Sequence, residues 1–403
     1  MTEADAVCEY ARRFHHVVGH QAVGGEHHVA SPLGAWLVLA LAAPAAVGDE
    51  RTRLAEVLGG DLDRAAAFAG ELLRAPHPAL RLGAAAWRRP GFESPALTNW
   101  LAGIADVAQV GDLPTQPAAD AWAAEMTGGL IDKFPLTIDT QTLLVLASTL
   151  ACAVSWWSPF ETAEVNELRL PVAPSFAGVR RFLRDPGSSR VGAIVASDVG
   201  RLGVHAAESK DGDLVVVSVV ADASVPAADV LERAHGVAVP IANDTELAAG
   251  ESLFDLPVGV GHSWTITERH APVSTRDGRE EHWDSTLLPS WSAESEHDLA
   301  RHPDLGFGVA AGALARLIGG YARFEAVQVA LARYTRTGFE AAAVTATAIF
   351  ASARLRERIG VVRTARLEFV RPYAVVAVAR GEGTPWAGLP VFSAWVTSPD
   401  ETD

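Results

Sequence analysis

The stretch that most constrains the fold runs from Gly338 to Arg358 and reads GFEAAAVTATAIFASARLRER. Its many alanines favour a helix, whereas the alternating, partly β-branched run Val344–Phe350 favours a strand. A segment with both preferences is either an ordinary Ala-rich helix or surface loop, or a loop that is able to become a strand. The rest of the chain decides between these interpretations.

Composition predicts a large core and excludes some partners. The 403 residues suffice for two or three ordinary domains or for one large domain. Apolar residues make up 49% of the chain and the mean hydropathy is +0.15, which argues against disorder. The net charge of −16 argues against nucleic acid or an anionic membrane as the main partner. Two distant cysteines, Cys8 and Cys152, give neither a disulfide framework nor a zinc spacing.

The ends and apolar runs of the sequence bear on location. The N-terminus has early acidic residues and no continuous apolar core, unlike a signal peptide. The longest apolar run, Ala35–Ala43, is shorter than the roughly 20 residues that a membrane helix needs. We therefore expect a cytoplasmic protein, or an extracellular one if it is exported by another route.

Helix signals dominate the first part of the chain and strand signals the later part. A Ser-Pro pair is a favoured helix start, and the apolar run after it, Leu33–Ala43, predicts a buried helix. Residues 142–154 (TLLVLASTLACAV) predict a strand buried on both faces, and Phe324–Tyr334 predicts another strand. No repeat or Gly/Ser linker divides the chain. This order favours an α+β fold in one large domain over residues 1–403.

Motifs of ordinary enzymes are missing from the sequence, which has no GxSxG, HExxH, CxxC or Walker motif. The stretch Gly306–Ala311 matches the loose GxGxxA dinucleotide pattern, but it lacks a preceding strand and the chain after it is too short for a nucleotide-binding half. A turn that starts a helix explains it better, and a dinucleotide enzyme is the third alternative. No metal site is expected, because five histidines near the N-terminus lack carboxylate or cysteine partners at a matching spacing: His15, His16, His20, His27 and His28.

Several segments, taken in order, resemble the serpin family. They are Ser31–Leu33, Trp122 with Thr127–Ile131, Thr142–Leu146, Trp156–Phe160, Leu288-Pro289 with Asp298-Leu299, Phe324–Tyr334, Gly338–Ala343, Phe369–Tyr373 and Pro390–Pro399. Each segment alone is a weak signal. Their order and spacing across nearly the whole chain make the resemblance specific, and it is weakest in residues 60–115 and 165–285.

The resemblance implies a fold and a mechanism. The fold has a large central mixed β-sheet, two further sheets, about eight or nine helices and an exposed reactive-centre loop at about residues 336–366. In this family a serine protease, or sometimes a cysteine protease, cleaves the loop, and the freed end inserts as a new central strand. The bound protease is carried to the far pole and distorted. We therefore expect a monomeric serine protease inhibitor that is not an enzyme and uses no cofactor.

The residues of the loop suit insertion into a sheet. A strand that enters between two others passes a narrow gap, so small side chains at its start lower the barrier. Period-two alternation puts an uncharged set on one face: Ala341, Ala343, Thr345, Thr347 and Ile349. Fourteen residues at about 3.3 Å each give roughly 45 Å of new strand. The predicted hinge comprises Arg336, Gly338, Phe339, Glu340, Ala341, Ala342 and Ala343, with the glycine supplying backbone freedom.

Four departures from the inhibitory pattern support an alternative. Phe339 stands where inhibitors usually carry Thr or Ser, and its ring is expected to slow insertion by overpacking. Arg336 replaces the usual glutamate, and its former partner position is Ser290. The predicted sheet-opening region comprises Ser31, Ser148, Trp156 and Gln328. In it, Gln328 stands where the family commonly has a buried histidine, and Ser148 stands where it has an asparagine. A hydrogen bond between Ser148 and Gln328 would substitute for the contact of that usual pair. The alternative is a non-inhibitory serpin-like binding protein whose loop does not insert efficiently.

The reactive bond has more than one candidate. Counting forward from Gly338 gives Ser352–Ala353, which suits an elastase- or subtilisin-like protease. Counting back from Phe369 gives a bond near Val361. Between the two lie Arg354, Arg356 and Arg358, which a trypsin-like protease would choose. A solvated basic face explains these arginines equally well.

Overall fold

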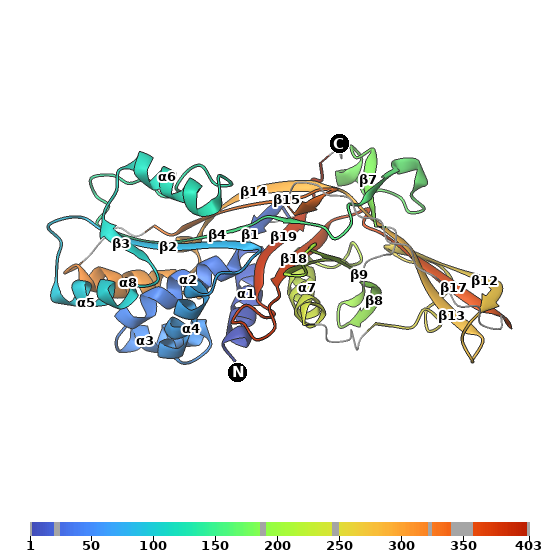
Figure 1. Cartoon of the computed structure of the whole chain (residues 1–403), viewed down its shortest axis with the longest axis horizontal. Coiled ribbons are helices and arrows are strands. Elements are labelled where there is room, and N and C mark those ends of the chain that lie inside the picture. Colours follow the sequence, from blue (N-terminus) through green and yellow to red (C-terminus); the bar gives the residue numbers. More distant parts are fainter. Residues whose placement is uncertain are drawn as a thin grey trace.

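The computed structural model describes residues 2–19, 25–185, 191–243, 250–320, 325–339 and 358–400, and these form an elongated arrangement of helices and sheets (Figure 1). The α-helices are α1 (Glu3–Gly19), α2 (Pro32–Ala42), α3 (Asp49–Leu58), α4 (Leu62–Arg74), α5 (Pro95–Ile104), α6 (Gln116–Thr127), α7 (Ala227–Ala242) and α8 (Phe307–Leu317). Short 3-10 helices are η1 (Ala43–Ala45), η2 (Val165–Glu167), η3 (Pro174–Phe176), η4 (Leu299–Arg301) and η5 (Pro303–Leu305). None of the described helices is long and apolar enough to cross a membrane.

The central sheet consists of two halves. One half has the order β3 (Gln109–Asp112), β2 (Leu80–Arg88) and β4 (Leu144–Cys152). The other half has the order β14 (Trp291–Asp298), β15 (Val327–Tyr334), β16 (Gly338–Phe339) and β5 (Val154–Ser155). Because β5 continues β4 after a single residue, the halves meet at one end. The sheet is mixed, as predicted, since β2 pairs with β3 in parallel and with β4 in antiparallel orientation.

Two six-stranded sheets complete the architecture. The first has the order β1 (His28–Ala30), β19 (Pro390–Val396), β18 (Tyr373–Ala379), β10 (Leu214–Val220), β9 (Gly200–Glu208) and β8 (Val191–Ser197). The second has the order β11 (Gly259–Val260), β12 (Trp264–Val273), β17 (Arg358–Glu368), β13 (Arg279–Leu288), β7 (Arg181–Asp185) and β6 (Glu161–Glu164). The valine-rich β10 lies between β9 and β18 and is buried over its whole length, including Ser218, its one polar residue.

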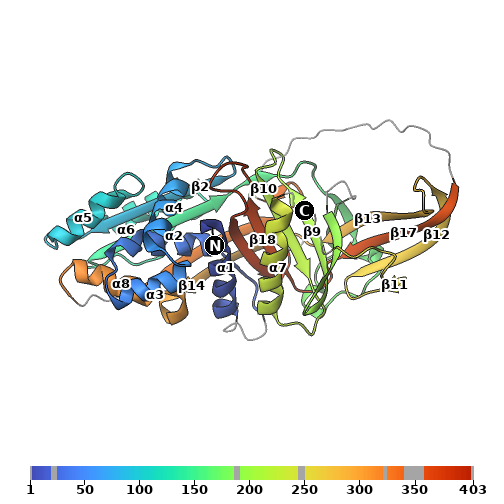
Figure 2. The same ribbon diagram turned by 90° about the horizontal axis from the view of Figure 1, so that it is seen from below.

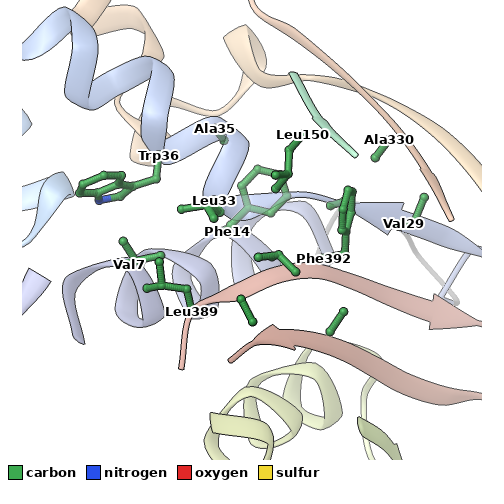
Figure 3. Packing of buried hydrophobic residues seen from close by; sticks show 14 of the residues in the cluster. Val7, Phe14, Val29, Leu33, Ala35, Trp36, Leu150, Ala330, Leu389 and Phe392 are labelled. Carbon is green, nitrogen blue, oxygen red and sulfur yellow. The ribbon is translucent and has the colours of Figure 1, made fainter. Parts of the chain in front are cut away.

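The core surrounds α2, which starts where the sequence predicts. The Ser31 hydroxyl caps the helix by accepting a hydrogen bond from the Gly34 backbone N–H at 3.2 Å. Leu33 and Trp36 on α2 are fully buried, and Figure 3 shows them among Phe14 of α1 and Phe392 of β19. Helices α1 and α7 lie side by side beneath the first six-stranded sheet (Figure 2).

The structure differs from the sequence-based expectation in residues 240–285, where no clear period was found. Long strands β12 and β13 lie there, with β17 between them, and the three form a ribbon that projects from the body (Figures 1 and 2). Three consecutive residues of β12, Glu268–His270, are all exposed, which removes the alternation that would have revealed a strand. The loop range 336–366 also overlaps strands β16 and β17 at its two ends.

The Gly306–Ala311 stretch has the structural role that the sequence favoured. Gly306 has a positive φ of +85° and immediately precedes α8, which begins at Phe307. The segment before it is the 3-10 helix η5 rather than a strand. This geometry is a helix-start turn and does not match the strand–turn–helix arrangement of a dinucleotide site.

We predict that Phe392→Ala lowers the free energy of unfolding by about 3–5 kcal/mol, because it removes a ring that is only 4% exposed from the core around α2. Phe92→Ala is the matched control. That ring is 39% exposed, so its removal should cost less than about 0.5 kcal/mol. Urea titration followed by tryptophan fluorescence measures both values, and equal losses would contradict this description of the core.

Candidate functional site

The candidate site is a gap between strands β4 and β15 in the central sheet. It holds a cavity of about 440 Å³. The walls are Leu144–Leu150 of β4 and Val327–Val329 of β15 with the two residues before it, and the floor includes α2 and α8. The bordering strands pair with β2 and β14 on their outer sides, so the gap faces the edges that are free to accept a further strand.

Gln328 holds the β15 side of the gap to the start of α2. Its side-chain Oε1 accepts a hydrogen bond from the Ser31 backbone N–H at 3.0 Å, and its Nε2 donates to the Ser31 carbonyl at 2.7 Å. The Ser31 hydroxyl in turn donates to the Val391 carbonyl of β19 at 2.9 Å. One amide group therefore binds both backbone groups of the residue that caps α2, and the Ser31 carbonyl also accepts from the Ala35 N–H at 3.2 Å.

Ser148 holds the β4 side of the gap to the same turn of α2. Its hydroxyl donates to the Gly34 carbonyl at 2.8 Å. The predicted mutual hydrogen bond is not what joins the strands, because Ser148 and Gln328 each bind α2. A Cβ atom on Gly34 would lie 3.6 Å from the Gln328 Nε2 and 3.7 Å from the Ser148 Oγ, so both side chains approach this glycine closely. We call these four residues, Ser31, Gly34, Ser148 and Gln328, the α2 clamp.

The hinge end of the site is held by Trp156. Its backbone N–H donates to the Thr337 carbonyl at 3.0 Å, and its indole Nε1 donates to the Thr335 carbonyl at 2.9 Å. The Phe160 N–H donates to the carbonyl of Arg336, whose side chain is exposed. A turn in which the Thr335 N–H bonds to the Gly338 carbonyl at 2.9 Å then reverses the chain. Trp156, predicted to lie in the sheet-opening region, is thus placed at the hinge.

Two residues after this turn already lie inside the central sheet. Strand β16 pairs with β15 through Phe339 and Tyr334, and with β5 through Gly338 with Ser155 and Phe339 with Val154. The Phe339 side chain is only 3% exposed, and its ring centroid lies 6.3 Å from that of Trp291. The Phe339 ring therefore occupies a buried position beside Trp291 and the neighbouring sheet, and its expected slowing of insertion stays a prediction.

An aromatic cluster surrounds this entry point, and the sequence analysis did not identify it. The rings of Trp156 and Tyr334 are 4.9 Å apart, and those of Trp291 and Tyr334 are 6.2 Å apart. Burial raises the pKa of Tyr334 well above its ordinary value, so its phenol stays neutral. The signal in the sequence was the placement of Trp156 just after one predicted strand and of Tyr334 at the end of another.

Ser290, named above as the former partner position of Arg336, contacts the C-terminal segment instead. Its hydroxyl donates to the Asp400 carbonyl at 3.4 Å, and the Asp400 N–H donates to the Ser290 carbonyl at 2.9 Å. Ser290 therefore holds the C-terminal segment against the start of β14.

The C-terminal end of the loop is anchored in the ribbon. Strand β17 begins at Arg358 and pairs along its whole length with β12, from Arg358 with Val273 to Leu367 with Trp264. Its other edge pairs in parallel with β13, where Val361 lies opposite Arg279. Outside the described residues lie the predicted hinge residues Glu340, Ala341, Ala342 and Ala343 and the candidate bond residues Ser352, Ala353, Arg354 and Arg356.

The site offers no obvious cofactor chemistry. In the described part of the chain, no group of three or more His, Cys, Asp or Glu side chains is placed to hold a metal ion. The cavity walls are mostly aliphatic, with the polar groups of the α2 clamp already bonded to one another. What the arrangement can do is accept a polypeptide strand, because the open edges supply backbone donors and acceptors.

The whole arrangement is similar to solved serpin structures. Tengpin, a thermophilic serpin in its native state, matches with a TM-score of 0.65 and 15% identity over 97% of this chain and 94% of that one. AtSerpin1 from Arabidopsis, in its native stressed conformation, matches with 0.62 and 16% over 99% of both chains. Thyroxine-binding globulin in complex with thyroxine matches with 0.63 and 13% over 98% of this chain and 100% of that one. No protein-family model and no curated protein matches the sequence. The chain has the serpin fold.

We predict that Gln328→Leu lowers the free energy of unfolding by about 1–3 kcal/mol, because it leaves the buried Ser31 N–H without a partner and removes one of the two hydrogen bonds to the Ser31 carbonyl. Gln109→Leu on the exposed edge strand β3 is the control and should change stability by less than about 0.5 kcal/mol. Thermal unfolding at neutral pH compares the two variants. If both variants lose the same amount of stability, the α2 clamp does not stabilise the first turn of α2.

Proposed function

We propose that this chain, with its serpin fold, is a serine protease inhibitor that acts once, by loop cleavage and strand insertion. The observation that carries the proposal is the match between the open gap and the sequence of the loop. The fold leaves room for one strand between β4 and β15, and the chain that leaves β16 is rich in small, uncharged residues.

The pairing of β16 supports a specific register for the inserted strand. Phe339 lies opposite Val154 on one side and Tyr334 on the other, and all three side chains are buried. Continuing this register sets Ala341, Ala343 and Thr345 opposite Cys152, Leu150 and Ser148 on β4 and opposite Ala332, Ala330 and Gln328 on β15. The residues with Phe339's parity then face the core, which is the uncharged set, and Glu340 faces away from the core.

In this register Thr345 enters the α2 clamp. Its neighbours there would be Ser148 and Gln328, which already bond to the first turn of α2. A small hydroxyl side chain fits between these groups, whereas a long charged one would be buried without a partner. The register also brings Ile349 opposite Leu144, the first residue of β4, so the inserted segment ends there.

The anchoring of β17 explains why cleavage precedes insertion. An intact loop is tied to β17, which is paired on both edges, so full insertion would require stripping β17 from β12 and β13. A cut after Ile349 and before Arg358 releases the inserting segment and leaves β17 in place. This favours Ser352–Ala353 as the reactive bond, with Arg354 and Arg356 as alternatives. Arg358 and Val361 are less suitable, because they lie within β17.

The chemistry of capture belongs to the protease. Its serine Oγ attacks the carbonyl carbon of the loop residue that precedes the reactive bond. The peptide bond breaks, that residue stays bound to the serine as an ester, and the new amine becomes the N-terminus of the C-terminal fragment. Insertion then moves the esterified end along the gap together with the enzyme. In this proposal the chain is a substrate that traps its enzyme and acts as a monomer. The partner is an elastase-, subtilisin- or trypsin-like serine protease.

A second candidate is a binding protein with the same fold whose loop inserts poorly. One solved neighbour, thyroxine-binding globulin, is described in complex with thyroxine, so this fold also serves proteins that bind a small molecule. Arg336 in place of the usual glutamate supports this candidate. The buried Phe339 argues against it, because the first bulky side chain has already entered the sheet.

We expect an SDS-resistant complex when the chain is mixed with an elastase-like or trypsin-like protease at equal concentration. Thr345→Arg should abolish the complex and turn the chain into an ordinary substrate, because a guanidinium cannot pass the clamp without burying an unpaired charge. Thr345→Ser is the control and should keep the complex. Complex formation is read on denaturing gels, and mass spectrometry of the released fragment identifies the bond.

Melting of the cleaved chain separates the two candidates. Insertion adds a strand with ladder bonds on both edges, so cleavage should raise the melting temperature of the wild-type chain but not that of Thr345→Arg. Cleavage with fully active protease and an unchanged melting temperature would favour the binding protein. A raised melting temperature without a complex would mean that insertion occurs but the protease escapes first.

A further inference from the structure

A cluster of histidines lies buried between α1, α7 and the two sheets above them, away from the gap. His15 of α1 is 0% exposed, His235 of α7 is 1% exposed and His28 of β1 is 8% exposed. The ring centroids of His15 and His235 are 5.0 Å apart, and those of His15 and His28 are 6.5 Å apart. The half-buried His297 of β14 extends the cluster, with its ring 6.1 Å from that of His28.

The hydrogen bonds of these rings fit neutral imidazoles. The His28 Nδ1–H donates to the Glu26 carbonyl at 2.8 Å, and its buried Nε2 has no hydrogen-bond partner among the described residues. The same residues offer no partner to either nitrogen of His235 or to Nδ1 of His15, whose Nε2 is bonded to Ser393. Each added proton would therefore create a buried N–H without an acceptor on a charged ring.

The charged groups around the cluster do not compensate for such a proton. From α1, Arg12 acts on His235 and disfavours its charged form, and the Arg12 partner Glu9 lies at the surface. His27 likewise lowers the pKa of His28, and His302 lowers that of His297. His15 is opposed by the other three rings, while β19 contributes only the Ser393 hydroxyl. Burial is the largest effect on all four and lowers each pKa.

We propose that the cluster of His15, His28 and His235 is an acid-sensitive catch that keeps α1, α7 and β1 packed together only while its rings are neutral. A metal site is not the explanation, since no group of three such side chains in the described residues is placed to hold one. Acidification forces charge into the seam, where no carboxylate of the described residues is hydrogen-bonded to any of the three rings. The acid sensitivity follows whether or not the chain inhibits a protease.

The catch has a direct connection to the central sheet. The His297 Nε2–H donates to the Val29 carbonyl at 2.8 Å, and the Ser295 hydroxyl accepts from the Val29 N–H at 3.1 Å. His297 also lies opposite Gln328 in the register of β14 and β15. Loosening β1 by protonation therefore acts on Val29–Ser31, the segment that the α2 clamp holds.

The sign and size of the effect follow from the folded-state pKa values. Burial lowers the pKa of His28 to about 4 and that of His235 to about 3, against 6.5 for the unperturbed ring. As pH falls below 6.5, the unfolded chain takes up protons that the folded chain refuses, so stability is lost progressively down to those values. At pH 5, each of these two histidines shifts the folding equilibrium about 30-fold towards the unfolded state.

His235→Leu tests the catch, because the ring it removes makes no hydrogen bond. Urea unfolding of the full chain at pH 8 and pH 5 gives the loss of stability on acidification. On going from pH 8 to pH 5, the unfolding equilibrium constant should rise by a factor that is about 30-fold smaller for His235→Leu than for the wild type. His270→Gln, which changes an exposed histidine of β12, is the matched control and should keep the wild-type pH dependence.

A second measurement does not depend on how the variant folds. NMR titration of the wild-type histidine rings should show that the rings of His15, His28 and His235 stay neutral down to pH 5, because burial lowers their pKa. Titration of all described histidines near 6.5 would overturn the proposal. An identical pH dependence of His235→Leu and His270→Gln would overturn it as well.

Discussion

The rest of the structure depends on the first turn of α2, because this turn binds both strands that border the open gap. Gln328 holds β15 to Ser31, Ser148 holds β4 to Gly34, and the Ser31 hydroxyl reaches β19. Net hydrogen-bond contributions of about 1 kcal/mol each are small beside the ladder bonds that an added strand would form along two edges. The clamp therefore sets the width of the gap and the geometry of entry without making the gap permanent.

The position of the gap also explains how the fold can keep unused strand edges. Free edges usually invite pairing with another chain. Here they lie inside the molecule, above α2 and α8, and the top of the gap is already occupied by β16. The segment that continues from β16 is the one best placed to fill it. Burial of Phe339 against Trp291 starts the strand at a fixed register, which a free peptide would have to find by itself.

Local signals in the sequence were sufficient for many elements. Ser31 and the proline after it mark the start of α2, the apolar run at residues 142–154 contains β4, and Gly128 ends α6 with a positive φ of +68°. The ribbon could not be found in this way, since its consecutive exposed charges break the period of two. The gap has no local signal in the sequence, because it is a place between β4 and β15 where the described sheet lacks a strand. The burial of Phe339 also had no local signal, since Trp291, which contacts its ring, comes from a distant part of the chain.

The position of the last strands gives the chain a particular route to its native state. Strand β17 lies between β12 and β13, and β18 lies between β10 and β19, although all three strands β17–β19 belong to the C-terminal end. Neither six-stranded sheet is complete until that end has been synthesised, and contacts over such long sequence separations form slowly. The nascent chain therefore waits with interior strand edges uncovered, a state that is prone to aggregation.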